Sequence, residues 1–171
     1  MMLEMQMGRR LVRENLGTES SKHTILVVAD EESIRNSVAA FLSRLGHSCF
    51  IAVDGIDALD KMKGNRIDAV ITDIKMPNMD GIMLTIEISK LHPECPIMVM
   101  STFDEEYSAG TAIAIGAAEF IKKPFLFDEF AIRLHKMIND WKTLRRLRSE
   151  RDGGDDMQDL VGELEETLRN T

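Results

Sequence analysis

Cysteine is scarce in this sequence, which contains only Cys49 and Cys95 among its 171 residues. Two thiols alone can build neither a disulfide framework nor a zinc site. The first twenty residues include Glu4 and Arg9 and lack a continuous apolar core, so they do not have the pattern of a secretory signal. We therefore expect both cysteines to be reduced structural thiols.

Long apolar runs and an excess of basic charge are also missing. No window approaches the roughly 18 uninterrupted apolar residues of a membrane-spanning helix, so we expect no membrane insertion. The 29 acidic residues outnumber the 21 basic ones, and the formal net charge of −8 disfavours nucleic-acid binding by the chain as a whole. An apolar share of 44% is ordinary for a globular protein. The composition indicates a soluble, cytoplasmic protein.

Short β-branched apolar runs alternate with amphipathic segments along the middle of the chain. The first run stops at acidic residues and Ser33, which suit the start of a helix, and Gly46 is typical of a helix C-terminal cap. Strands alternating with helices of this length predict right-handed βαβ units. The pattern predicts strands over residues 24–29, 49–53, 69–72, 96–100 and 118–122, with helices over 34–45, 56–62, 82–91, 105–115 and 128–141.

This alternation predicts an α/β fold with a doubly wound, five-stranded parallel sheet over residues 23–140. Residues 1–22 show no clear apolar period, and we expect them to form a disordered N-terminal tail. Residues 141–171 are expected to form a helical C-terminal extension or a linker to an output domain outside this chain.

Two features divide this C-terminal extension. Trp141, Leu144 and Leu147 continue the final helix, and the pair Gly153-Gly154 is expected to break it. A second amphipathic helix is expected to follow, and its stripe indicates packing on the domain or on a partner helix, including a homodimer. The apolar stripe consists of Met157, Leu160, Val161, Leu164 and Leu168.

Polar side chains follow four of the predicted strands, at the edge where ligands bind in an open parallel sheet. Facing carboxylates need a cation between them, and oxygen ligands completed by water suit Mg²⁺. A carboxylate beside such an ion could attack a phosphoryl group, while a lysine and a hydroxyl contact the phosphoryl oxygens. The residues concerned are Asp30 and Glu31, Asp73, Ser101 and Thr102, and Lys122 and Lys123.

The four histidines are scattered along the chain, and none has a second ligand at metal-binding spacing in the sequence. We therefore assign no function to them. They are His23, His47, His92 and His135.

Four stretches of the sequence resemble the receiver domain of two-component response regulators. The run from Asp73 through Met76-Pro77 to Asp80-Gly81, combined with Lys123-Pro124-Phe125, is the specific part of the resemblance. Intervals of 43, 28 and 22 residues separate Asp30, Asp73, Ser101 and Lys123, and all three suit this family. The matching stretches are residues 25–31, 71–81, 99–101 and 116–125.

The resemblance implies a flavodoxin-like (βα)5 receiver fold and a phosphoacceptor switch that assists only its own phosphorylation and dephosphorylation, rather than an enzyme. Asp73 would accept a phosphoryl group from a sensor histidine kinase or a phosphotransfer protein. Asp30, Asp73 and the backbone carbonyl of Lys75 would hold Mg²⁺. Ser101 and Lys123 would contact the phosphoryl oxygens.

The resemblance also implies a route for the signal. Phe120 occupies the aromatic switch position of the family, which turns inward when the hydroxyl residue, here Ser101, moves toward the phosphoryl group. The same residue would also be expected in an ordinary core. The surface around the fourth helix and the fifth strand would change on phosphorylation.

One departure from the family pattern concerns the metal site. The family usually carries two adjacent acidic residues at the end of the first strand, and here the first of them is Ala29. Glu31 or Glu32 could substitute as a ligand from further along the chain, and we expect weaker Mg²⁺ affinity with phosphorylation retained. Thr102 is bulkier than the small residue common at its position. The alternative is a phosphorylation-independent pseudo-receiver that acts as a protein-interaction module.

Two other classes of protein with this architecture are disfavoured by the sequence. A hydrolase with an aspartate nucleophile resembles a pattern with a second aspartate two residues later, where this chain has Lys75. A flavin or nucleotide carrier needs a phosphate-cradling loop after the first strand, and the acidic run from Asp30 to Glu32 would repel a phosphate there without a metal.

Overall fold

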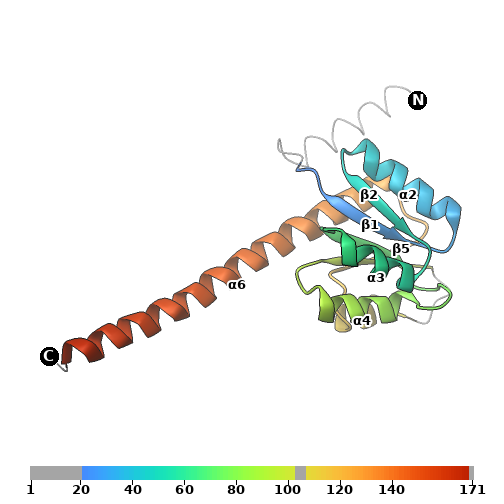
Figure 1. The fold of residues 1–171 in the computed structure, drawn as a ribbon. Helices are drawn as coiled ribbons and strands as arrows, with labels where there is room; N and C mark the ends of the chain where they lie inside the picture. Colours follow the sequence, from blue (N-terminus) through green and yellow to red (C-terminus); the bar gives the residue numbers. More distant parts are fainter. Residues whose placement is uncertain (1–20, 103–106, 170–171) are drawn as a thin grey trace, which may run out of the picture. The chain divides into compact units, whose positions relative to one another are not determined.

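The computed structural model describes residues 21–102 and 107–169, with side chains up to residue 152. The five strands form one sheet in the order β2-β1-β3-β4-β5, and every neighbouring pair is parallel. Figure 1 shows this sheet with β1, β2 and β5 labelled. The predicted α/β architecture is therefore confirmed. The strands are β1 (Thr24–Val28), β2 (Ser48–Ala52), β3 (Ala69–Asp73), β4 (Ile97–Ser101) and β5 (Glu119–Lys122).

Helices alternate with these strands along the chain, as predicted. Residues 1–20 and 103–106 lie outside the described residues, so the disordered tail at 1–22 stays a prediction. The helix expected over 105–115 begins later than predicted, at Ala109 after its N-cap Ser108. The helices are α2 (Glu32–Arg44), α3 (Gly55–Gly64), α4 (Gly81–Leu91), α5 (Ala109–Ala114) and α6 (Phe127–Arg169).

Apolar side chains pack on both faces of the sheet. One face is covered by α3, α4 and α5, and the other by α2 and the first part of α6. β3 and β4 are buried at every position, which explains why their sequences are continuous apolar runs rather than alternating ones. The largest fully buried side chains include Phe130, Ile25, Leu26, Leu42, Ile71, Leu84 and Met98.

The helix ends follow local sequence signals. Asp54, Asp80 and Ser108 cap α3, α4 and α5, each accepting a hydrogen bond from a backbone N–H in the first turn. Gly46 lies just past the end of α2 with a φ of +95°, a left-handed conformation that glycine adopts without steric cost. This confirms Gly46 as the predicted C-terminal cap.

The C-terminal part of the chain differs from the prediction. The described residues divide into two separate compact units after Ile138, and α6 continues without interruption to Arg169. The pair Gly153-Gly154 does not break the helix, so that prediction was wrong. Glycine lowers helix stability by about 1 kcal/mol per residue, but it does not exclude helical backbone angles.

Among the described helices, none combines the length and the apolar composition that a membrane span requires. Cys49 and Cys95 are both free and form no disulfide. Burial raises the pKa of the Cys95 thiol to about 12, and it also raises the pKa of Cys49. Both thiols are therefore protonated at neutral pH. This agrees with the expectation of reduced structural cysteines.

Three histidines that are far apart in the sequence meet in the fold. His47 Nδ1 accepts the backbone N–H of His23 at 3.2 Å, and His47 Nε2 lies 2.9 Å from His135 Nε2. Because Nδ1 of His47 accepts a hydrogen bond, the neutral ring carries its own hydrogen on Nε2 and donates a hydrogen bond to Nε2 of His135. Neither nitrogen of His47 then offers a lone pair to a metal. We call these three hydrogen-bonded residues, His23, His47 and His135, the relay. The relay joins the start of β1, the turn before β2 and α6.

The relay depends on neutral imidazoles. Burial, together with the nearby His135 and His23, lowers the pKa of His47 to about 4. Burial and His23 also lower the pKa of His135. A proton on Nδ1 of His47 would face the N–H of His23, so protonation must break the relay.

We expect this relay to make folding stability sensitive to mild acid. Because the pKa of His47 in the folded chain lies below its ordinary value of 6.5, the stabilisation is complete above pH 6.5 and is lost as the pH falls toward 4. The free energy of unfolding should drop by on the order of 2 kcal/mol between pH 7.5 and pH 5. Urea unfolding at the two pH values measures this drop.

Two variants separate the relay from other titrating groups. In the double variant His47→Gln with His135→Gln the acid-induced drop should shrink, because neither glutamine titrates. The control His92→Gln alters a histidine outside the relay and should keep the full drop. An identical pH dependence in all three proteins would contradict the assignment.

Candidate functional site

The site is centred on Asp73, the last residue of β3. This strand lies between β1 and β4, so its end is enclosed by neighbouring strands on both sides. The side chain of Asp73 is only 6% exposed. A buried carboxylate is costly unless a cation or several hydrogen bonds compensate it, so its surroundings indicate what the site can do.

Lys123 supplies the compensating charge. Its Nζ lies 2.6 Å from Oδ1 of Asp73, and the lysine side chain is 18% exposed. The backbone N–H of Lys123 donates to the carbonyl oxygen of Ser101 at 2.7 Å, which holds the segment after β5 alongside β4. The structure thus brings together two residues separated by 50 positions, both singled out from the sequence.

Ser101 lies on β4, the strand beside that of Asp73, and Phe120 lies on β5, one strand further out. Ser101 ends β4 and is fully buried, and its hydroxyl donates to the carbonyl oxygen of Thr102 at 3.0 Å. Phe120 pairs in register with Val99 on β5 and β4, and its side chain is buried in the core on the α3–α5 face. The hydroxyl and the aromatic ring therefore belong to one packed region.

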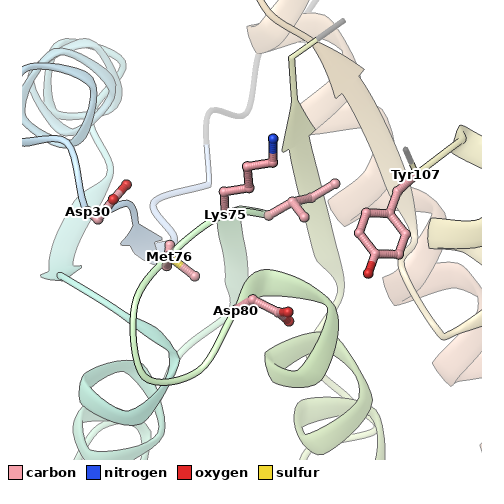
Figure 2. Close-up of a pocket in the computed structure, with 6 residues that line it drawn as sticks. Asp30, Lys75, Met76, Asp80 and Tyr107 are labelled. Carbon is pink, nitrogen blue, oxygen red and sulfur yellow. The ribbon is translucent and has the colours of Figure 1, made fainter. Parts of the chain in front are cut away.

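Asp30 and Lys75 lie in an open cleft beside the end of β3. The cleft has a volume of about 480 Å³, and Figure 2 shows Asp30 and Tyr107 on opposite sides of the loop that carries Lys75. Sequence reasoning missed Asp80 and Tyr107 as lining residues. Asp80 stands in the motif that carries the family resemblance, but its capping of α4 also explains it. The cleft is lined by Asp30, Ile74, Lys75, Met76, Asp80 and Tyr107.

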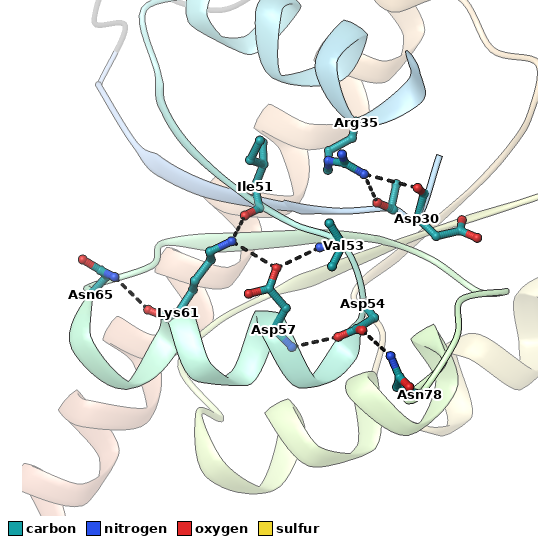
Figure 3. A network of polar contacts seen from close by, with 10 residues as sticks. Asp30, Arg35, Ile51, Val53, Asp54, Asp57, Lys61, Asn65 and Asn78 are labelled. Atoms are coloured by element: carbon teal, nitrogen blue, oxygen red, sulfur yellow. Dashed lines mark hydrogen bonds and ion pairs between the residues drawn. The ribbon is translucent and has the colours of Figure 1, made fainter. Parts of the chain in front are cut away.

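Glu31 does not line this cleft. Its carboxylate accepts the hydroxyl of Ser33 at 2.7 Å, at the start of α2. Ala29 directly follows β1 and is fully buried, and its methyl side chain has no oxygen atom that could bind a metal. Arg35 folds back over this segment, donating to the carbonyl oxygens of Ala29 at 2.8 Å and Asp30 at 3.3 Å (Figure 3). The guanidinium of Arg35 therefore holds the backbone just before α2 in place.

The loop after Asp73 turns back tightly on its own strand. The N–H of Gly81 donates to the carbonyl oxygen of Ile74 at 2.7 Å. A Cβ at Gly81 would lie only 1.8 Å from the carbonyl oxygen of Asp73, so no other residue fits without moving the backbone. Thr85 donates to the carbonyl oxygen of Gly81 at 2.7 Å and fixes the first turn of α4.

The donor set fits a hard divalent cation. Asp30, Asp73 and the carbonyl oxygen of Lys75 are all oxygen donors, which Mg²⁺ prefers, and Mg²⁺ is usually bound by one or two carboxylates with water in other positions. Among the described residues, no three histidine, cysteine or acidic side chains are grouped to hold a metal.

Comparisons with known proteins point to one family. The family model of the response regulator receiver domain matches residues 25–135. Response regulator MprA from Mycobacterium sp. strain KMS is 33% identical over 114 residues, which cover 67% of this chain and 50% of the relative. MprA from Mycobacterium avium strain 104 is 32% identical over 118 residues, covering 69% and 52% of the two chains. The chain thus spans about half the length of these curated relatives.

Solved structures agree with this match. NtrX from Brucella abortus is 35% identical with a TM-score of 0.71, and the match covers 75% of this chain and 29% of that one. A response regulator receiver domain protein from Clostridium thermocellum is 29% identical with a TM-score of 0.63, covering 73% and 98%. The receiver domain of NtrX is 37% identical with a TM-score of 0.64, covering 67% and 98%.

The close approach at Gly81 can be tested by adding one methyl group. We expect Gly81→Ala to lower the free energy of unfolding by about 3 kcal/mol, because its Cβ would meet the backbone of Asp73. The matched control is Gly64→Ala at the end of α3, where no atom lies within 4 Å of the added carbon. Urea denaturation compares the two, and equal stability would contradict the close approach.

Proposed function

The chain belongs to the response regulator receiver domain family, and from this premise we propose that it is a phosphoacceptor switch centred on Asp73. Response regulators are signalling proteins that interact with histidine kinases. The observation that carries the proposal is the buried carboxylate of Asp73 with Lys123 Nζ at 2.6 Å, at the carboxyl edge of the sheet. A sensor histidine kinase or a phosphotransfer protein would be the donor.

The proposed reaction transfers a phosphoryl group from a phosphohistidine to Asp73. An oxygen of the carboxylate attacks phosphorus, the P–N bond breaks, and its electron pair returns to the imidazole of the donor. The product is an acyl phosphate on Asp73. Lys123 stands where its ammonium can pair with a phosphoryl oxygen, because it already pairs with the attacking carboxylate. Ser101 is the second proposed contact for the phosphoryl group.

Receiver domains generally use Mg²⁺ at the phosphorylation site, and the residues here suit it. Asp30, Asp73 and the carbonyl oxygen of Lys75 would hold the ion, with Glu31 as a weaker candidate because it bonds Ser33 instead. When bound, the ion neutralises negative charge as the phosphoryl group approaches the carboxylate. The chain's own task is to present these oxygens on two loops at one edge of the sheet.

We propose that the signal leaves through Ser101 and Phe120. If the Ser101 hydroxyl turns from the carbonyl oxygen of Thr102 toward a phosphoryl oxygen, the space around β4 and β5 changes. Phe120 has no hydroxyl, so it can respond only by packing. The surface formed by α5 and β5 would then differ between the two states.

The partners beyond the donor belong to the same proposal. The extension after residue 138 is helical to Arg169, which suits either a homodimer through this helix or a connection to an output domain. The charge of −8 makes nucleic acid an unfavourable partner for this chain alone. We include a cytoplasmic location in the same proposal.

One observation favours a second candidate, a pseudo-receiver that signals by binding alone. Ala29 is apolar and fully buried at the position where the family usually has a carboxylate. The site then has one acidic side chain fewer to attract a cation. The phosphoacceptor switch and the pseudo-receiver therefore predict opposite results in a phosphorylation assay.

The first test is the intact mass of the protein after incubation with Mg²⁺ and acetyl phosphate. We expect the wild type to gain one phosphoryl group and Asp73→Asn to gain none, because an amide cannot form the acyl phosphate. The control Asp60→Asn changes an exposed carboxylate on α3 and should leave labelling intact. No gain in the wild type, also with a histidine kinase as donor, would favour the pseudo-receiver.

The second test restores the acidic pair. We expect Ala29→Asp to strengthen Mg²⁺ binding by about tenfold, because a carboxylate acting through water adds negative charge beside Asp30. Ala29→Asn has nearly the same shape without the charge and should bind Mg²⁺ like the wild type. Titration calorimetry measures both affinities, and an unchanged affinity for Ala29→Asp would refute this account of the site.

A further inference from the structure

The turn between β2 and α3 is fastened to the loop that follows Asp73. Asn78 Nδ2 donates to Oδ2 of Asp54 at 2.7 Å, and the two side chains face each other in Figure 3. One residue further along each segment, the N–H of Gly55 donates to the carbonyl oxygen of Met79 at 3.0 Å. Two hydrogen bonds therefore join segments 24 residues apart in the sequence.

Asp54 serves both segments at once. Its Oδ1 accepts the N–H of Asp57 at 2.8 Å and caps α3, while Oδ2 holds Asn78. The residue is only 7% exposed. The hydrogen bonds from Asp57 and Asn78 hold the pKa of Asp54 below its ordinary value, so the group is a carboxylate at neutral pH. Hydrogen bonds to an ionised acceptor are roughly twice as strong as neutral ones.

The backbone on each side is adapted to this contact. Asn78 has a φ of +64°, in the left-handed region that asparagine tolerates better than most residues. A Cβ at Gly55 would lie 2.6 Å from Cγ of Met79, so the segments approach as closely as glycine allows. The left-handed φ of Asn78 and the close approach at Gly55 occur at the same contact. This contact therefore requires one particular backbone geometry in both segments.

The contact fastens the tip of a loop whose base is closed at the end of β3 and whose Met76 and Met79 side chains pack against the core. The hydrogen bond from Gly81 to Ile74 closes the loop 75–80 at the end of β3. Its tip carries Asn78 and Met79, which reach the β2–α3 turn. Between base and tip lie Lys75 and Met76, which line the cleft, and the loop ends at Asp80.

We propose that Asp54 and Asn78 are positioning residues for the site at Asp73. By holding the tip of the loop, they aim the carbonyl oxygen of Lys75 and the side chain of Asp80 into the cleft. The inference rests on the proposed function, because it explains the shape of the loop by the binding of a cation and a phosphoryl group.

The chemistry of the cation explains why this positioning matters. Mg²⁺ requires nearly ideal octahedral geometry at about 2.0–2.1 Å, so a loop that samples several shapes presents its carbonyl oxygen correctly for only part of the time. Groups that orient ligands without touching the metal typically contribute 10- to 100-fold to metal affinity or activity. Neither Asp54 nor Asn78 is among the residues that line the cleft, so their effect would pass through the loop.

The test compares Asn78→Ala with a matched control, Asn65→Ala, at the C-terminal end of α3. Asn65→Ala removes an asparagine hydrogen bond of similar length, 2.9 Å, to the carbonyl oxygen of Lys61 at the other end of α3. Three measurements are made on the full chain: hydrogen exchange of residues 75–80, calorimetric binding of Mg²⁺ alone, and the rate of phosphorylation by acetyl phosphate across Mg²⁺ concentrations.

We expect Asn78→Ala to exchange about tenfold faster in the loop and to bind Mg²⁺ about tenfold more weakly. Its phosphorylation rate should fall at low Mg²⁺ and recover at saturating Mg²⁺. A merely structural defect would instead lower the rate at every concentration. Asn65→Ala should match the wild type in all three measurements.

Two further variants separate the side-chain bond from the backbone angle and the helix cap. Asn78→Gly keeps access to a positive φ but removes the amide, and it should behave like Asn78→Ala. Asp54→Ser can still cap α3 through its hydroxyl but loses Asn78, and it should give the same weakening. If Asn78→Gly or Asp54→Ser retains the wild-type Mg²⁺ affinity, the inference is overturned.

The outcomes also distinguish this inference from the proposed function. If the wild type is never phosphorylated while Asn78→Ala still loosens the loop and weakens Mg²⁺ binding, the phosphoacceptor role fails and the positioning role stands. If the wild type is phosphorylated and Asn78→Ala is unchanged in exchange and in Mg²⁺ binding, the positioning role fails and the phosphoacceptor role stands.

Discussion

The site depends on one buried ion pair, between the carboxylate of Asp73 and the ammonium of Lys123. An unpaired carboxylate that is 6% exposed at the end of a central strand would strongly destabilise the fold. The lysine comes from the end of β5, which is separated from β3 by β4. Strand order is therefore as important as residue identity, because β4 sets the gap that the lysine side chain must cross.

The sheet supplies a rigid platform, and three loops on its carboxyl edge carry the chemistry. Three contacts hold two of these loops: Arg35 donates to backbone carbonyl oxygens before α2, and the β3–α4 loop is held at its tip by Asp54 and closed at its base by Gly81. Functional residues often lie on loops that a rigid scaffold positions.

Ala29 stands where the family usually has an acidic residue, and no neighbouring side chain replaces that carboxylate in the cleft. The cleft keeps Asp30 and the oxygen donors of the loop after Asp73, whereas Glu31 is engaged with Ser33 and does not replace the missing carboxylate. With one acidic side chain fewer, the site depends more on how precisely the remaining donors are placed. That dependence links the proposed metal site to the contact between Asp54 and Asn78.

The sequence by itself determined the order of strands and helices and the edge to which Asp30, Asp73, Ser101 and Lys123 belong. Apolar periodicity and the rules of parallel sheets are local or topological, so a single sequence contains them. Only the tertiary structure decided which side chains touch, since these contacts join residues far apart in the chain and depend on packing. Such contacts are the pair of Asp73 with Lys123, the relay of His23, His47 and His135, and the bond between Asp54 and Asn78.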